Sequence, residues 1–251
     1  MRCITTLLIL CSCSILAQNQ NKYETYFEKG NGNQSATYQE TIAYFQLLAN
    51  DFESIDMKTM GLTDSGEPLH IVTFNPDATF DFEAIQKNKA VLLINNGIHA
   101  GEPDGIDASM QFFRDLALGK IKAPKNTVIV CIPVYNIGGA LNRNNATRAN
   151  QNGPEEYGFR GNARNYDLNR DFIKSDTRNT KSFVEIYHTI KNIQKVSGFL
   201  GSGDKPTPIS DQEIQRILGS VSESAINQKS GISFEIGEKV KVCDGPFASF
   251  N

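Results

Sequence analysis

The chain has 251 residues, of which 39% are hydrophobic, and a formal net charge of −3 at pH 7. This is the content of a globular domain, and the near balance of charges gives no electrostatic basis for binding nucleic acid or a membrane surface. Composition therefore excludes a strongly basic or strongly acidic binding protein. Motifs along the chain must supply the evidence for function.

Residues 1–17 have the pattern of a secretory signal peptide. Arg2 precedes an apolar core that is too short to span a bilayer, and small residues lead up to Ala17. We expect cleavage after Ala17 and export, to the periplasm or as a secreted protein. A lipoprotein site at Cys13 is the alternative. Two cysteines lie beyond this region, Cys131 and Cys243, and both are expected to be free thiols.

The next predicted elements are a flexible lead-in, a helix and a hairpin. Residues 18–36 are rich in Asn, Gln and Gly and are expected to be the lead-in. Thr37 and Glu40 form a capping box that predicts a helix through Phe52. Residues 57–62 and 68–74 then flank the turn sequence Asp64-Ser65-Gly66, which predicts a β-hairpin.

Strands and helices alternate after the hairpin. The predicted order is a strand over 90–95, a helix over 104–118, a strand over 127–134 and a helix over 176–189. This alternation predicts an α/β fold built on a mixed sheet with helices on both faces.

The most informative motif follows the predicted strand over 90–95. His99 and Glu102 lie between that apolar run and the amphipathic helix that begins after Pro103. Open α/β sheets bind ligands at the carboxyl ends of their strands, and imidazole and carboxylate groups both suit zinc. A catalytic zinc usually takes three protein ligands, so this motif supplies two of them. A histidine three residues before a glutamate also arises by chance, and alone the motif is weak.

A polar loop after the strand over 127–134 strengthens the prediction of a site. It carries four arginines and ends in the run Asp-Leu-Asn-Arg-Asp-Phe over 167–172; the arginines are Arg143, Arg148, Arg160 and Arg164. The loop has no hydrophobic stripe and cannot be core. Guanidinium and amide groups are suited to binding a carboxylate and stabilising an oxyanion. A solvated basic loop is the other interpretation.

With these two motifs, residues 38–188 resemble the amino-terminal part of the carboxypeptidase A-like zinc metallocarboxypeptidase family. The resemblance implies that His99 and Glu102 are zinc ligands. It implies that Asn169 and Arg170 bind the terminal carboxylate of a peptide substrate. The motifs occur in the family's order, with about 65 residues between them, and together they are far more specific than either alone.

The resemblance also implies a catalytic arginine that polarises the scissile carbonyl. Arg148 is the best match, and Arg143 and Arg160 compete for the role. The family's third zinc ligand is a histidine well beyond the Asn-Arg pair, and its general base is a glutamate later still. The downstream histidine here, His188, is interpreted as a residue at the surface or end of a helix, and His70 as a packed or edge histidine of a strand.

Residues 188–251 are similar to a different family, the bacterial transcription termination and antitermination factor NusG. The similarity implies the end of its amino-terminal domain with a short helix over 189–218, a linker over 219–233, and the start of an SH3-like KOW barrel over 234–251. The alternating strand over 239–242 is expected to lack the partner strands that close such a barrel.

The expected organisation is therefore a chimera that joins two incomplete proteins near residues 187–189. A signal peptide over 1–17 and a lead-in over 18–36 precede an incomplete carboxypeptidase-like domain over 37–188, and the NusG-like fragment follows. The first functional hypothesis is an exported zinc metallocarboxypeptidase that removes carboxyl-terminal residues from peptides and is inactive as this chain alone. The alternatives are a NusG-like factor that binds RNA polymerase and a zinc deacylase acting on small acyl-amino acids.

Overall fold

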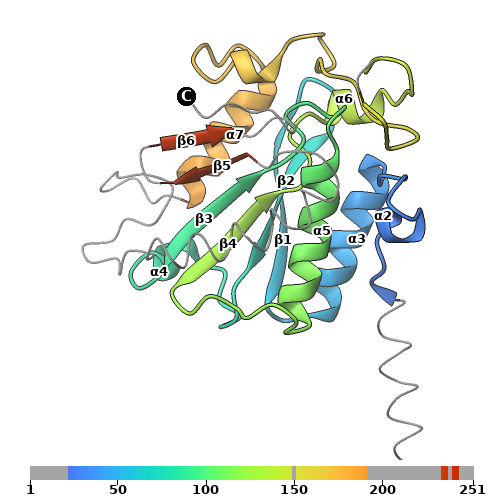
Figure 1. Cartoon of the computed structure of the whole chain (residues 1–251). Coiled ribbons are helices and arrows are strands. Elements are labelled where there is room, and N and C mark those ends of the chain that lie inside the picture. The colour runs from blue at the N-terminus through green and yellow to red at the C-terminus, as the bar shows by residue number, and fades with distance from the viewer. Residues whose placement is uncertain (1–21, 149–150, 191–232, 237–238, 243–251) are drawn as a thin grey trace, which may run out of the picture.

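A computed structural model describes residues 22–148 and 151–190 together with the backbone of residues 233–236 and 239–242. The strands form one sheet in the order β1-β2-β4-β3-β5-β6 (Figure 1). The first four strands and the helices that pack on them confirm the predicted mixed α/β fold.

The predicted hairpin is present. β1 (Ile55–Leu62) and β2 (Pro68–Phe74) pair antiparallel. The turn between them contains Gly66 with φ +87°, a left-handed conformation that glycine adopts at no steric cost. The short turn sequence is thus the local reason for the hairpin.

The centre of the sheet is the parallel pair of β3 (Ala90–Asn95) and β4 (Thr127–Ile132). All side chains of both strands are buried, as expected for strands covered on both faces. α5 (Asp104–Ala117) is the crossover between them. On its other side β4 pairs antiparallel with β2, so the sheet is mixed. Cys131 in β4 is a buried free thiol, as predicted.

Helices cover the two faces of this sheet (Figure 1). α3 (Tyr38–Asp51) and α5 pack against each other on one face, and α7 (Arg178–Ile190) packs against β1 and β2 on the other. Three short helices, α4 (Phe82–Ile85), α6 (Ile137–Leu141) and the 3-10 helix η1 (Leu168–Arg170), lie in the connections. The predicted helices begin and end within two residues of the observed ones.

The remaining two strands form an antiparallel hairpin, β5 (Ser233–Ile236) with β6 (Lys239–Val242). β5 also pairs with the end of β3, at Ile94 and Asn95. The strand predicted over 239–242 is thus present, but it extends the main sheet, and an SH3-like barrel stays a prediction.

The lead-in is more ordered than the sequence predicts over its described part. α2 (Tyr26–Lys29) has its own capping box between Thr25 and Glu28, and Tyr23 is 6% exposed. Arg114 of α5 donates to the carbonyl oxygen of Tyr23 at 3.2 Å and so fixes this segment to the domain. Such a long-range contact leaves no signal in the local composition.

Several predictions concern residues outside those the structure describes. They are the signal peptide over 1–17, the short helix after Ser210, most of the linker over 219–233, and Cys243. Among the helices that are described, none has the length and apolar character that crossing a membrane requires.

The capping box of α3 yields a test of the fold. The Thr37 side chain accepts from the backbone N–H of Glu40 at 3.3 Å, and the Glu40 side chain accepts from the backbone N–H of Thr37 at 2.8 Å. Replacing Thr37 by Ala removes one half of this exchange and should lower the free energy of unfolding by about 1 kcal/mol. Urea denaturation measures the change. Thr79→Ala, at an exposed position outside any helix, is the control and should have little effect. Equal losses for the two variants would contradict the capping role.

Candidate metal centre

The loop that carries His99 is joined to the loop that follows the neighbouring strand. The backbone N–H of Tyr135 donates to the carbonyl of Asn96 at 2.8 Å, and that of Asn136 donates to the carbonyl of Gly97 at 3.0 Å. Gly97 has φ +64°, which permits the sharp turn out of β3. The carboxyl ends of β3 and β4 therefore hold His99 at a fixed place on the edge of the sheet.

His99 is buried and contacts the aspartate that begins η1. The side chain of His99 has no exposed surface, and its Nε2 lies 2.8 Å from Asp167 Oδ1. Asp167 also accepts from the backbone N–H of Asn169 at 3.0 Å and from Arg160 Nη2 at 2.9 Å. Partial burial alone would raise the pKa of Asp167, but the contacts with His99 and Arg160 outweigh it and lower the pKa to about 2. Asp167 is therefore an ionised acceptor.

These contacts fix which nitrogen of His99 carries the proton. Arg160 Nη1 lies 3.1 Å from His99 Nδ1, and a guanidinium group can only donate. An ionised carboxylate can only accept, so His99 Nε2 donates to Asp167 and His99 Nδ1 accepts. A ring nitrogen fixed in this way by a carboxylate on the opposite side is the usual state of a histidine that binds a metal.

Glu102 faces the same side of the imidazole. Its Oε2 lies 3.8 Å from His99 Nδ1 and is buried without a hydrogen-bond partner among the described residues. Its Oε1 pairs with Arg148 Nη1 at 2.5 Å. Burial would raise the pKa of Glu102, and the ion pair with Arg148 acts in the opposite direction and helps to hold the pKa below its ordinary value.

His99 and Glu102 fit a zinc ion as two of its ligands. Zinc takes nitrogen and oxygen ligands at about 2.0–2.2 Å, so two ligand atoms of a tetrahedral site lie about 3.4 Å apart. His99 Nδ1 and Glu102 Oε2 are close to that separation at 3.8 Å. Within residues 22–148 and 151–190, no third histidine, cysteine or carboxylate completes a metal-binding group.

Asn169 and Arg170, the predicted substrate-binding pair, lie on the short helix that Asp167 caps. The side chain of Arg170 is exposed, and its Nη1 lies 3.4 Å from the carbonyl oxygen of Asn169. Asp167 contacts both His99 and the backbone of this helix, so it joins the histidine to the segment that carries the pair. The structure thus brings together the two motifs that the sequence separates by about 65 residues.

The segment that carries η1 is fixed at both ends by the turn of the β1–β2 hairpin. The Asp64 carboxylate accepts from Asn162 Nδ2 at 2.9 Å and from the backbone N–H of Arg178 at 3.3 Å. Phe172, just after η1, stacks on Tyr135 with ring centroids 5.7 Å apart. These contacts restrict the loop although it has no hydrophobic stripe.

The four arginines of the loop divide into two groups. Arg148 and Arg160 contact Glu102 and His99, as described above. Arg143 instead donates to the carbonyl oxygens of Ser35 and Ala36, at 3.1 and 3.3 Å, and holds the lead-in. Arg164 lies over the ring of Tyr166 at 4.7 Å. Of the two competitors of Arg148, Arg160 is therefore next to the candidate site, and Arg143 binds the lead-in.

Sequence reasoning missed Asp167 as a partner of His99 and left Arg160 only as a competitor. A signal for Asp167 was present, since an aspartate two residues before Asn169 is typical of a helix N-cap. No local signal could join it to His99, because that contact spans 68 residues.

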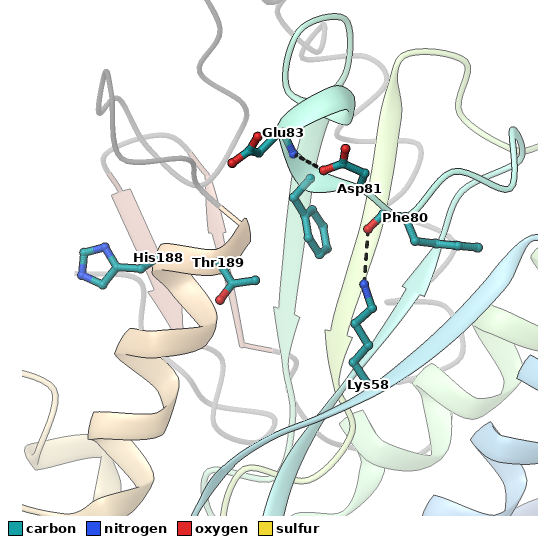
Figure 2. A pocket seen from close by; sticks show the side chains of 7 residues that line it. Lys58, Phe80, Asp81, Glu83, His188 and Thr189 are labelled. Carbon is teal, nitrogen blue, oxygen red and sulfur yellow. Dashed lines mark hydrogen bonds between the residues drawn. The ribbon is translucent and has the colours of Figure 1, made fainter.

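The other two histidines lie where the sequence analysis placed them. His188 is on the exposed side of α7, where it lines a cavity with Lys58, Phe80 and Glu83 (Figure 2). The described lining of that cavity, of about 700 Å³, includes none of the predicted site residues. His70 is a half-buried residue of β2, paired with Thr59 of β1.

The arginine loop crosses the histidine loop at a glycine. The backbone N–H of Gly158 donates to the carbonyl of Ala100 at 3.1 Å. A Cβ atom on Gly158 would lie 2.7 Å from each of Ala100 Cβ, Ala100 O and the carbonyl oxygen of Gly139. Only glycine allows this approach, which sets the position of Arg160 two residues later.

A family model of zinc carboxypeptidases, Peptidase M14, matches residues 41–236. This range covers more than half of the chain and contains the whole site described above, so the chain belongs to the zinc carboxypeptidase family. The match runs past residue 188, where the sequence analysis placed the end of the carboxypeptidase-like part. That boundary stays a prediction.

Solved carboxypeptidases are among the proteins of similar structure. A metallo-carboxypeptidase from Burkholderia cenocepacia is 15% identical over 62% of this chain and 39% of its own, with a TM-score of 0.47. Carboxypeptidase A from Helicoverpa armigera is 18% identical over 43% of this chain and 26% of its own, with a TM-score of 0.37.

The similarity to NusG is confirmed for about a quarter of the chain. The transcription termination/antitermination protein NusG of Pasteurella multocida is 43% identical over 68 residues, and that of Pseudomonas aeruginosa is 47% identical over 66 residues. These matches cover 27% and 26% of this chain. The chain spans only about 37% of the length of these curated relatives.

A buried carboxyl group on α5 gives the domain a dependence on pH. Asp107 is 2% exposed and accepts from the backbone N–H of Ala36 at 3.3 Å. Burial raises the pKa of Asp107 to about 7, above the ordinary value of 3.8. A carboxyl group whose pKa is raised on folding contributes stability that is complete below its unfolded pKa and is lost as the pH rises through the folded value.

Replacing Asp107 by Asn should therefore reduce the loss of stability between about pH 4 and pH 7. The amide oxygen still accepts from Ala36, and the cost of burying a charge disappears. Urea midpoints of the wild type and of Asp107→Asn, measured at pH 5 and pH 8, test the effect. A larger fall in the variant than in the wild type between these two pH values would refute it.

Proposed function

We propose that this chain carries the metal-binding and substrate-binding part of a zinc-dependent carboxypeptidase. In this proposal His99 Nδ1 and Glu102 are zinc ligands, and Asp167 orients His99. Arg148 is the catalytic arginine, and Asn169 and Arg170 bind the terminal carboxylate of a peptide. The observation that carries the proposal is the contact of His99 Nε2 with Asp167, which leaves Nδ1 on the side of the buried Glu102 Oε2, 3.8 Å away.

Zinc bound in such a site polarises a carbonyl and lowers the pKa of a water molecule. The residues of the chain supply the rest of the environment. Asp167 holds the imidazole through Nε2, so that the ring cannot rotate away from Glu102. Arg148, only 24% exposed, holds a guanidinium group at the edge of the site, where it can stabilise the negative charge that develops on a carbonyl oxygen.

Recognition of the substrate end is assigned to η1. Arg170 is exposed, and a planar guanidinium group with a neighbouring amide is suited to bidentate capture of a free carboxylate. The backbone N–H of Arg170 donates to the carbonyl of Asp167 at 3.0 Å, which supports a carboxylate-binding role close to the proposed metal ligands. A peptide with a free carboxyl terminus is therefore the proposed substrate.

The proposal includes inactivity of this chain alone. The described residues offer two metal ligands and no third, and two ligands bind zinc weakly.

We further propose that the carboxypeptidase-like domain spans residues 37–188, that residues 189–251 are a NusG-like segment, and that the chain is exported. Recovery of the protein from the periplasm tests the last point, and co-purification with RNA polymerase would contradict it.

Zinc titration of the purified chain tests the metal site. The wild type should bind zinc weakly, and His99→Ala should abolish that binding because it removes one of two ligands. His188→Ala is the matched control and should leave binding unchanged. Isothermal titration up to millimolar zinc measures all three. Retention of wild-type binding in His99→Ala would exclude the site, and stoichiometric binding at nanomolar affinity would show that a third ligand exists.

The role of Arg170 can be tested in a fusion in which the carboxyl-terminal half of a zinc carboxypeptidase follows Tyr187. Arg170→Ala should lower kcat/KM for peptides with a free carboxyl terminus by roughly one to two decades, which corresponds to about 1.5–3 kcal/mol for a lost charge-assisted contact. Zinc content should not change. Peptides with an amidated terminus are the control. An equal loss on the two kinds of peptide, or loss of the zinc, would show that Arg170 does not bind the carboxylate.

A further inference from the structure

Arg160 occupies the side of His99 that the proposed zinc ion requires. Its guanidinium group spans two partners, with Nη2 at 2.9 Å from Asp167 Oδ2 and Nη1 at 3.1 Å from His99 Nδ1. The backbone carbonyl of Arg160 accepts from Asn136 Nδ2 at 2.9 Å, so the main chain is fixed while the side chain is 45% exposed. The side chain can therefore turn toward solvent without moving the loop.

A guanidinium group and a zinc ion cannot share Nδ1. The nitrogen has one lone pair, and a bound zinc ion would lie about 2.0–2.1 Å from it along the direction that Arg160 now occupies. The charges also conflict. The two carboxylates of the site are already neutralised by two arginines. Glu102 forms an ion pair with Arg148, and Asp167 forms one with Arg160. A divalent cation in addition would leave the site with an excess positive charge.

We propose, on the basis of the proposed metal site, that Arg160 is a latch on His99 Nδ1, and that its side chain must turn outward before zinc can bind there. The latch lowers zinc affinity and slows zinc binding. Arg160 is a better candidate for this movement than Arg148, because its side chain is 45% exposed and that of Arg148 is 24% exposed.

Arg160 also has a contact that favours zinc binding. Arg160 also supports Asp167, and loss of an outer partner of a metal-binding histidine typically weakens metal binding 10- to 100-fold. Asp167 keeps two other contacts, however, since His99 Nε2 lies at 2.8 Å and the backbone N–H of Asn169 at 3.0 Å. Removal of Arg160 therefore frees Nδ1 more than it disturbs Asp167.

The experiment compares zinc binding to the full chain in four forms. They are the wild type, Arg160→Ala, Arg160→Lys and Arg164→Ala. Affinity is measured by competition with a fluorescent chelator and the association rate by stopped flow, with circular dichroism as a check on folding. Arg160→Ala should bind zinc about tenfold more tightly and associate faster, the change expected when one charge-assisted hydrogen bond no longer has to be broken.

Arg160→Lys should behave like Arg160→Ala, because a single ammonium group paired with Asp167 cannot also reach His99 Nδ1. Arg164→Ala should match the wild type, since Arg164 lies against Tyr166 and Asp64. A weaker affinity in Arg160→Ala, of the size expected for Asp167→Asn, would overturn the latch and make Arg160 a support of Asp167. An unchanged affinity would overturn it as well.

A further variant separates failure of the latch from failure of the proposed function. His99→Ala must lose zinc binding if the metal site is correct, whatever Arg160 does. If zinc binding depends on His99 and Arg160→Ala equals the wild type, the metal site stands and the latch is wrong. If His99→Ala binds zinc as the wild type does, the metal site itself is wrong and the latch falls with it.

Discussion

The carboxylate of Asp167 is the interaction on which the arrangement of this site depends. It accepts from a strand-end histidine, from an arginine of the long polar loop and from the first turn of η1. The loop after β3 is therefore joined, across 68 residues of sequence, to the polar loop and η1 at one ionised group. Each contact alone is modest, but together they fix the ring of His99 and join it to the helix that carries Asn169 and Arg170. A neutral side chain at position 167 would weaken all three at once.

Most of the fold could be predicted because its signals are local. The capping box at Thr37 and Glu40, the turn at Gly66 and the uninterrupted apolar run of β3 each determine an element with little help from the rest of the chain. The position of His99 and Glu102 at the end of a buried strand was predictable for the same reason. Their contacts with the polar loop could not be predicted from the sequence.

The unpredicted features all depend on contacts between distant segments. Arg143 and Arg160 are equivalent by composition, and only the packing of the lead-in gives Arg143 the backbone carbonyls of Ser35 and Ala36. The order of the lead-in itself comes from Arg114 of α5, far along the chain. Sequence patterns report which face of an element is apolar, and they carry little information on which of several arginines meets a given acceptor.

The close contact of Gly158 with Ala100 divides the long loop into two parts that differ in how well they tolerate insertions. One part is the excursion between Asn144 and Tyr157, and the other is the segment from Gly158 to Arg160. Tyr157 and Asn144 exchange backbone hydrogen bonds at 2.8 and 2.9 Å, so the excursion between them is closed at its base. Insertions after Arg148 within that excursion would lengthen a closed loop, and the entropy lost on closing a loop grows only slowly with its length. Such insertions would leave the contact between Gly158 and Ala100 in place. An insertion of a single residue between positions 158 and 160 would instead shift the guanidinium group off the histidine. Length variation among relatives should therefore concentrate on the excursion.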